Sequence, residues 1–233
     1  DNTLFKIITY LFGGGICIKV FMGLLSMFSF LITFSTGIYG RIFVTEHYGL
    51  ANKHSLVAVI PPKVVIESNQ ITDPNTLTIK KEDNSKIFQQ NIYTSLLNRQ
   101  ADGKMYVGIQ DINKTNESIN KNSADLSKMS TGEICEMFEV DGILSSQFVI
   151  SEPVPTFITY LSLFLTLIED GLFSLNNNDL KEVSMNLSLR DCETTSLLWN
   201  YADDRSGGIL DSYSNLVSSL MVRASKNIPY YIK

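Results

Sequence analysis

The sequence predicts an α/β fold in which helices flank a mixed sheet. Residues 55–60 form a continuous apolar, β-branched run, which is typical of a strand buried on both faces. Residues 183–190 alternate between apolar and polar, which predicts a half-buried strand, and residues 213–224 carry one apolar helical stripe. The expected order is strand, helix, strand, helix, strand, then an antiparallel hairpin and a long C-terminal helix.

Length and charge limit the classes of function. The 233 residues are 44% hydrophobic and carry a net charge of −5, which is enough chain for one sizeable core. We therefore expect a single α/β domain at 41–233. Nucleic-acid binders usually concentrate basic residues on one face, and the only adjacent basic pair, Lys80–Lys81, is followed at once by acidic residues. A nucleic-acid partner is not expected.

The amino-terminal 40 residues differ from the rest, because 11–39 is almost wholly apolar. From Lys19 onward the pattern is that of a secretory signal peptide: a positive charge, an apolar run at 20–34, and small residues at 35–37. Residues 1 to about 17 are then expected to lie upstream of the signal. An uncleaved membrane anchor and a buried helix are the alternatives, since a span needs about 20 apolar residues.

The first half of the mature chain is expected to alternate strands and helices. Residues 55–63 predict a strand that ends at Pro61–Pro62, because proline cannot donate to a ladder. A polar loop at 67–86 should lead into a helix at 87–100. Residues 104–111 predict a second strand, and the polar tract that follows predicts a surface loop or weak helix.

A compact helix-to-strand unit follows at 130–150. Thr131 can cap a short helix that places Ile134 and Phe138 inward, and Asp141–Gly142 should end it before a third strand at 143–150. Glu133, Glu136 and Glu139 share this helix, and a solvated face is expected for them rather than an acid/base pair. Strands that alternate with helices in this way predict parallel pairings.

The carboxyl-terminal part predicts a hairpin and a helix. A strand at 183–190 is joined by a polar turn to a return strand on which Leu197, Trp199 and Tyr201 alternate. Residues 203–208 are expected to be the turn between this strand and the last helix, because their composition suits a turn. A cation site at Asp203–Asp204 is disfavoured, since the spaced oxygen ligands of a calcium loop are missing.

The uncharged segment 154–168 predicts either a helix buried in the core or at an oligomer contact, or an element that touches a membrane or a partner. It is short for a membrane-spanning helix, and an exposed patch this apolar would need a cover. The candidate contact residues are its large apolar side chains: Phe157, Tyr160, Leu161, Phe164, Leu165 and Ile168.

The sequence shows no constellation that supports catalysis. The only histidines, His47 and His54, precede the first strand, and no nucleophile elbow, phosphate-binding loop or dinucleotide fingerprint occurs. No metal or cofactor is expected. Cys135 and Cys192 could pair in an oxidising compartment, but nothing in the sequence brings them together, and two unpaired thiols are the prediction.

Three short motifs carry a resemblance to a known family. They are "VIPP" at 59–62, "VDGIL" at 140–144 and "ETTSLLW" at 193–199. In this order, after a signal peptide, they resemble bacterial envelope proteins that share the fold of the TolB amino-terminal domain and of the curli-secretion lipoprotein CsgG, especially small periplasmic lipoproteins. The resemblance implies an α/β envelope domain without catalytic residues. The lipid-attachment cysteine of those lipoproteins is missing here.

Together these observations predict an exported, non-enzymatic envelope protein that acts through protein–protein contacts in assembly or secretion. Its expected place is the periplasm or the periphery of the outer membrane, and its expected contact surfaces are 157–168 and the terminal helix. Homo-oligomer formation and membrane contact stay open. The alternatives are a domain tethered to the inner membrane by its leader, and a periplasmic protein that binds or hydrolyses a small ligand.

Overall fold

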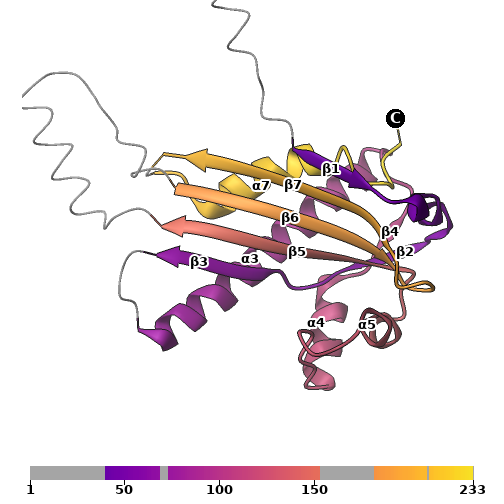
Figure 1. The fold of residues 1–233 in the computed structure, drawn as a ribbon, viewed down its shortest axis with the longest axis horizontal. Helices are drawn as coiled ribbons and strands as arrows, with labels where there is room; N and C mark the ends of the chain where they lie inside the picture. The colour runs from indigo at the N-terminus through magenta and orange to yellow at the C-terminus, as the bar shows by residue number, and fades with distance from the viewer. Residues whose placement is uncertain (1–39, 69–72, 153–180, 209, 233) are drawn as a thin grey trace, which may run out of the picture. The chain divides into compact units, whose positions relative to one another are not determined.

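A computed structural model of the protein describes residues 40–68, 73–152, 181–208 and 210–232. These residues form a seven-stranded mixed sheet with helices on both faces, as predicted (Figure 1). Six strands follow one another in the order β1-β7-β6-β5-β2-β4, and β3 also pairs with β5. The strands are β1 (Arg41–Val44), β2 (Leu56–Val59), β3 (Lys63–Ser68), β4 (Gly108–Ile109), β5 (Gly142–Glu152), β6 (Lys181–Asp191) and β7 (Leu197–Gly207).

The parallel half of the sheet is built on β5. Both β2 and β3 pair with β5 in parallel, one after the other along its length, and β4 pairs in parallel with β2. The expectation that the strand at 55–63 simply ends at Pro61–Pro62 was therefore incomplete. The two prolines interrupt the ladder for a few residues, and pairing resumes at Lys63 because Val64 and Ile66 again supply apolar side chains to the sheet.

The antiparallel half contains the predicted hairpin. β6 pairs with β5 on one side and with β7 on the other, and β1 closes the sheet at the far side of β7. The register shifts between Leu189, which faces Trp199, and Arg190, which faces Leu197. Leu198 is thus the extra residue of a bulge, and both it and Trp199 are fully buried.

The prediction of a turn at 203–208 was wrong, because β7 continues to Gly207. Asp203 lies opposite Met185 in the ladder and is buried. Its carboxylate accepts a hydrogen bond of 2.8 Å from the Tyr201 hydroxyl and lies 3.0 Å from Nε of Arg223. An acidic residue is tolerated at this inward position because both partners lie within the domain.

The helices are α3 (Pro74–Ala101), α4 (Ile112–Lys121), α5 (Thr131–Phe138) and α7 (Tyr213–Ala224), with a 3₁₀ helix η1 (Glu46–Lys53). α3 begins well before the predicted residue 87. Asp73 caps it by accepting a 3.0 Å hydrogen bond from the backbone of Thr76, with Pro74 at the first helical position. The caps of α5 and α7 are Ser130 and Ser212, so Thr131 is the first residue of its helix rather than the cap.

Two layers of helix cover the sheet unequally. α3 and α7 lie together on one face and enclose the larger core with inward side chains of β5, β6 and β7 (Figure 1). α4 and α5 cover only the end of the other face near β2, where a smaller cluster includes Ala58, Phe138 and Ile143. The apolar stripe of α7 is buried in the larger core, so the terminal helix does not offer it as a contact surface.

Within the described part of the chain, no helix combines the length and the apolarity needed to cross a membrane.

Candidate functional site

The residues predicted to contact a partner or a membrane lie outside the described residues. This applies to the whole set: Phe157, Tyr160, Leu161, Phe164, Leu165 and Ile168. The described chain brings its other functional residue types together at one end of the sheet. There the start of β2, the β6–β7 turn, α5 and the chain's last residues meet.

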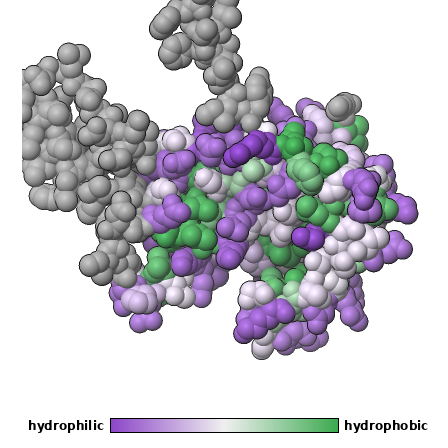
Figure 2. Space-filling model, viewed as in Figure 1, coloured by the Kyte–Doolittle hydropathy of each residue, from purple (hydrophilic) through white to green (hydrophobic). Residues whose placement is uncertain are grey.

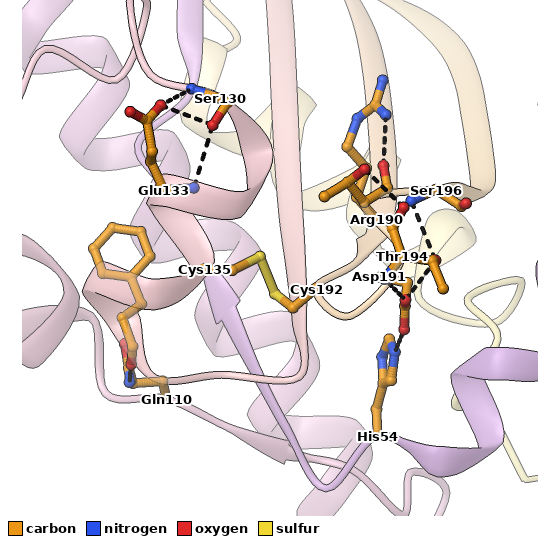
Figure 3. Close-up of a disulfide and its surroundings, with 12 residues drawn as sticks. His54, Gln110, Ser130, Glu133, Cys135, Arg190, Asp191, Cys192, Thr194 and Ser196 are labelled. Atoms are coloured by element: carbon orange, nitrogen blue, oxygen red, sulfur yellow. Dashed lines mark hydrogen bonds and ion pairs between the residues drawn. A yellow bond between two sulfur atoms is a disulfide. The ribbon is translucent and has the colours of Figure 1, made fainter.

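His54 is the centre of this site (Figure 3). Its side chain is only 2% exposed, at the end of η1 and just before β2. Its Nε2 lies 2.8 Å from Oδ1 of Asp191, and its Nδ1 lies 2.5 Å from the hydroxyl of Tyr230. A Cβ on Gly142 would lie 2.7 Å from Nδ1, so a residue without a side chain is needed there.

The hydrogen bonds of His54 fit one neutral tautomer. A carboxylate only accepts hydrogen bonds, so Nε2 carries the proton and donates to Asp191. In the neutral imidazole, Nδ1 then accepts from the Tyr230 hydroxyl. That hydroxyl belongs to a fully buried side chain, and burial, together with the nearby Tyr106 and acidic groups, raises the pKa of Tyr230. Both ring nitrogens are thus occupied, and the tyrosine is closed to solvent.

Two carboxylates fix the turns around His54. Oδ2 of Asp191 accepts hydrogen bonds of 2.6 Å each from the backbone and the hydroxyl of Thr194. Oδ2 of Asp141 accepts from the backbone and hydroxyl of Ser55 at 2.8 and 2.6 Å, and from the backbone of Leu56 at 3.0 Å. These bonds hold the turn after β6 and the first residues of β2 in place.

Hydrogen bonding lowers the pKa of both carboxyl groups. For Asp141, the hydroxyl of Ser55 makes the largest contribution. For Asp191, burial acts in the opposite direction, but the hydrogen bonds from Thr194 and His54 outweigh it and leave the pKa below its ordinary value. Both groups are therefore anionic at neutral pH.

Acid should destabilise the domain through these two carboxylates. Their pKa values are lower in the folded chain than the unfolded value of about 3.9, so the unfolded chain binds more protons in acid. Their contribution to stability is complete above about pH 4 to 5 and is lost as the pH falls through the folded pKa values. At pH values below about 4, we expect unfolding to occur at a lower urea concentration than at neutral pH. This decrease should be smaller in the variant Asp141→Asn. A midpoint that stays constant through this range would contradict the role of these carboxylates.

A disulfide lies next to this network. Cys135 of α5 and Cys192 of the β6–β7 turn are bonded, with Cα atoms 5.6 Å apart (Figure 3). The prediction of two unpaired thiols was wrong. α5 packs on the sheet face beside the hairpin turn, and this contact between elements 57 residues apart in the sequence has no signature in local periodicity.

The surface above the network is hollowed by a cavity of about 410 Å³. His54, Asp191 and the two bonded cysteines line it, and Lys53, Glu136 and Glu193 are among the charged residues around them. Among the described residues, no three or more His, Cys, Asp or Glu side chains are arranged so that they could hold a metal ion. Nε2 of His54 is bonded to Asp191 and Nδ1 to Tyr230, and His54 and Tyr230 are both buried, so this network is a buried junction between the segments that it joins.

A larger hollow of about 700 Å³ lies between the start of β3, α3 and α4. Pro61, Pro62 and Ile119 give it an apolar lining, with Lys81 and Lys86 also on its wall. At its base the buried Gln89 donates to the carbonyl of Val59 at 2.9 Å and exchanges hydrogen bonds with Asn116. Gln89 and Asn116 thus bond each other across the base of this hollow.

Sequence reasoning placed His54 correctly before the strand that is now β2, but it missed both β1 upstream and the role of the histidine. Its partners Asp191 and Tyr230 lie 137 and 176 residues away. The one local signal was a histidine directly before a buried apolar run, where a polar side chain needs a partner.

No family model matches the chain, and no curated protein matches its sequence. Among solved structures, the PelC dodecamer from Paraburkholderia phytofirmans is 11% identical with a TM-score of 0.41, covering 83% of this chain and 98% of that one. Lipoprotein GNA1162 from Neisseria meningitidis is 14% identical with a TM-score of 0.42, covering 74% and 96%. The LpoB C-terminal domain from Salmonella enterica is 11% identical with a TM-score of 0.29, covering 66% and 82%.

These solved structures come from bacteria, and one is named a lipoprotein. At such identities and TM-scores, function has to be argued from the residues of this chain. The resemblance to TolB- and CsgG-type proteins in particular stays a prediction.

Proposed function

We propose that the protein is an exported, non-enzymatic component of the bacterial cell envelope that works through protein–protein contacts in envelope assembly or secretion. The observation that carries the proposal is the disulfide between Cys135 and Cys192. Disulfides persist in oxidising compartments such as the periplasm and are rare in the reducing cytosol. The signal-like pattern at 19–37 points in the same direction.

The junction around His54 supports the non-enzymatic part of the proposal. Its histidine, carboxylates and tyrosine are the residue types from which a catalytic site is built. Here they bond one another and hold three distant segments together, and Tyr230 is fully buried. Because the network is buried, it supports a role in holding these segments together.

The uneven cover of the sheet supports action through contacts. Among the described residues, α4 and α5 cover only one end of the face opposite α3 and α7, and the outward side chains of β5, β6 and β7 on that face are mostly hydroxyl and amide groups. Asn200 donates to Asn186 at 2.6 Å and to Ser188 at 2.8 Å across this face. Hollows of about 250 and 310 Å³ lie on this face, and its exposed hydrogen-bonding groups suit contact with a macromolecular partner.

The proposal is tested by fractionating bacteria that produce the full chain. We expect the domain in the fraction released by osmotic shock, together with a periplasmic marker. A domain that stays with the membrane but is digested by protease added to spheroplasts would support the tethered alternative. A domain found with the cytoplasmic marker, and protected from that protease, would overturn the proposal.

A further inference from the structure

One edge of the sheet exposes an unusual run of apolar residues. Among the strands of the described residues, β1 is the last one beyond β7, and Ile42, Phe43 and Val44 on it are 49%, 59% and 48% exposed. Figure 2 shows hydrophobic side chains gathered over this strand. β3, at another edge, carries exposed charges at Lys63 and Glu67, which discourage pairing with a further strand. On β1, Arg41 is the only charged residue that could discourage such pairing.

The backbone of β1 presents an ordered set of hydrogen-bonding groups at this edge. The amide of Thr45 donates to the carbonyl of Leu198 on β7 at 3.2 Å. Since residues of an antiparallel strand bond alternately to one neighbour and the other, Phe43 and Arg41 also turn toward β7. The N–H and C=O groups of Ile42 and Val44 therefore point away from the sheet.

This strand is complementary to a second copy of itself. A two-fold axis through Phe43 places Phe43 opposite its symmetry mate, and Ile42 opposite Val44 of the other copy. The backbone N–H and C=O groups of Ile42 and Val44 are the ones that point away from β7. In each of the two Ile42–Val44 pairs, the two residues can therefore exchange two hydrogen bonds. The central phenylalanines form an aromatic cross-strand pair. Arg41 meets the neutral Thr45, so no like charges lie opposite each other.

We infer that β1 pairs antiparallel with β1 of a second copy, about an axis through Phe43, and joins two sheets into one. This inference rests on the proposed function and deepens it by naming a surface and a partner for the protein contacts. A pairing of five residues on each strand buries far less than the roughly 1,200 Å² of a stable interface, so we expect weak, concentration-dependent association. Disulfide crosslinking between two copies is therefore the appropriate measurement, because it detects weak association.

The test places a cysteine on the two-fold axis. In the full chain carrying Cys17→Ser, the substitution Phe43→Cys brings two thiols opposite each other in a pair that is not hydrogen-bonded. Cα atoms in such pairs are about 4.5 Å apart, within the range that disulfides span. Mild oxidation should give a covalent dimer, seen by non-reducing electrophoresis and intact mass, with the Cys135–Cys192 bond retained.

The neighbouring positions supply matched controls. Ile42 has an exposure similar to that of Phe43, but in the proposed pairing it lies opposite Val44 of the second copy. The two thiols of Ile42→Cys are therefore diagonal neighbours, and this variant should form dimer at least about ten times more slowly than Phe43→Cys. Mixing Ile42→Cys with Val44→Cys should restore fast crosslinking. Adding Ile42→Pro to Phe43→Cys removes an outward N–H while sparing the bonds to β7, and should slow the reaction.

Equal rates for Phe43→Cys and Ile42→Cys, or no dimer from Phe43→Cys at the highest attainable concentration, would overturn the self-pairing. Either result would leave the export half of the proposed function untouched, because fractionation tests that half separately.

Discussion

Replacing Cys135 and Cys192 together with serine is expected to lower the free energy of unfolding by about 4 kcal/mol. The bond closes a loop between residues 57 apart, and the chain-entropy relation gives about this value for a loop of that length. The loss should appear as a lower midpoint in urea, with a slope at least as steep as that of the parent, because the unfolded chain is less compact without the bond. The far-ultraviolet circular dichroism of the folded state should stay the same, because α5 keeps its capping box at Ser130 and Glu133.

Reduction of the unaltered protein provides the control for this substitution. It should lower the midpoint by the same amount as the double serine variant, and the variant itself should not respond to reductant. A variant as stable as the parent, or one that still responds to reductant, would contradict a bond between these two residues.

Replacing His54 with leucine is expected to cost about 3 kcal/mol of stability. Leucine fills much of the ring's space but leaves the Tyr230 hydroxyl and one carboxylate oxygen of Asp191 buried without their partner. An unsatisfied buried polar group costs about 1 to 3 kcal/mol. Tyr230→Phe removes one hydrogen bond without leaving an unpaired donor on residue 230, so its cost should be smaller, about 1 kcal/mol.

The second histidine is a matched control. The side chain of His47 is 50% exposed and lies 3.5 Å from the exposed carboxylate of Glu46. His47→Leu should change stability by less than about 0.5 kcal/mol, as surface substitutions usually do. Equal losses from His54→Leu and His47→Leu, measured by urea unfolding at pH 7, would show that the buried junction contributes nothing particular.

Periodicity predicted those parts of the fold that bury one face or both. The continuous apolar run of β2, the alternation in β6 and the stripe of α7 each matched the structure, because each pattern is dictated by the side of the element that faces the core. β1 escaped prediction, since four residues are too few to show a period and none of them is buried.

Two errors concern where elements begin and end. Residues 203–207 have the composition of a turn, yet Asp203 is held inside β7 by Tyr201 and Arg223. The first half of α3 lacks a continuous apolar stripe and follows instead from the cap at Asp73. The disulfide and the His54 junction depend on which elements pack together, which local patterns do not encode.

The most direct test of the account is the redox state of Cys135 and Cys192 inside the cell. Cells that produce the full chain with Cys17→Ser would be quenched in acid, and free thiols would then be labelled with a maleimide of high mass before and after reduction. We predict no label before reduction and two labels after it, in the fraction released by osmotic shock. Two labels before reduction would contradict an exported protein stabilised by this disulfide.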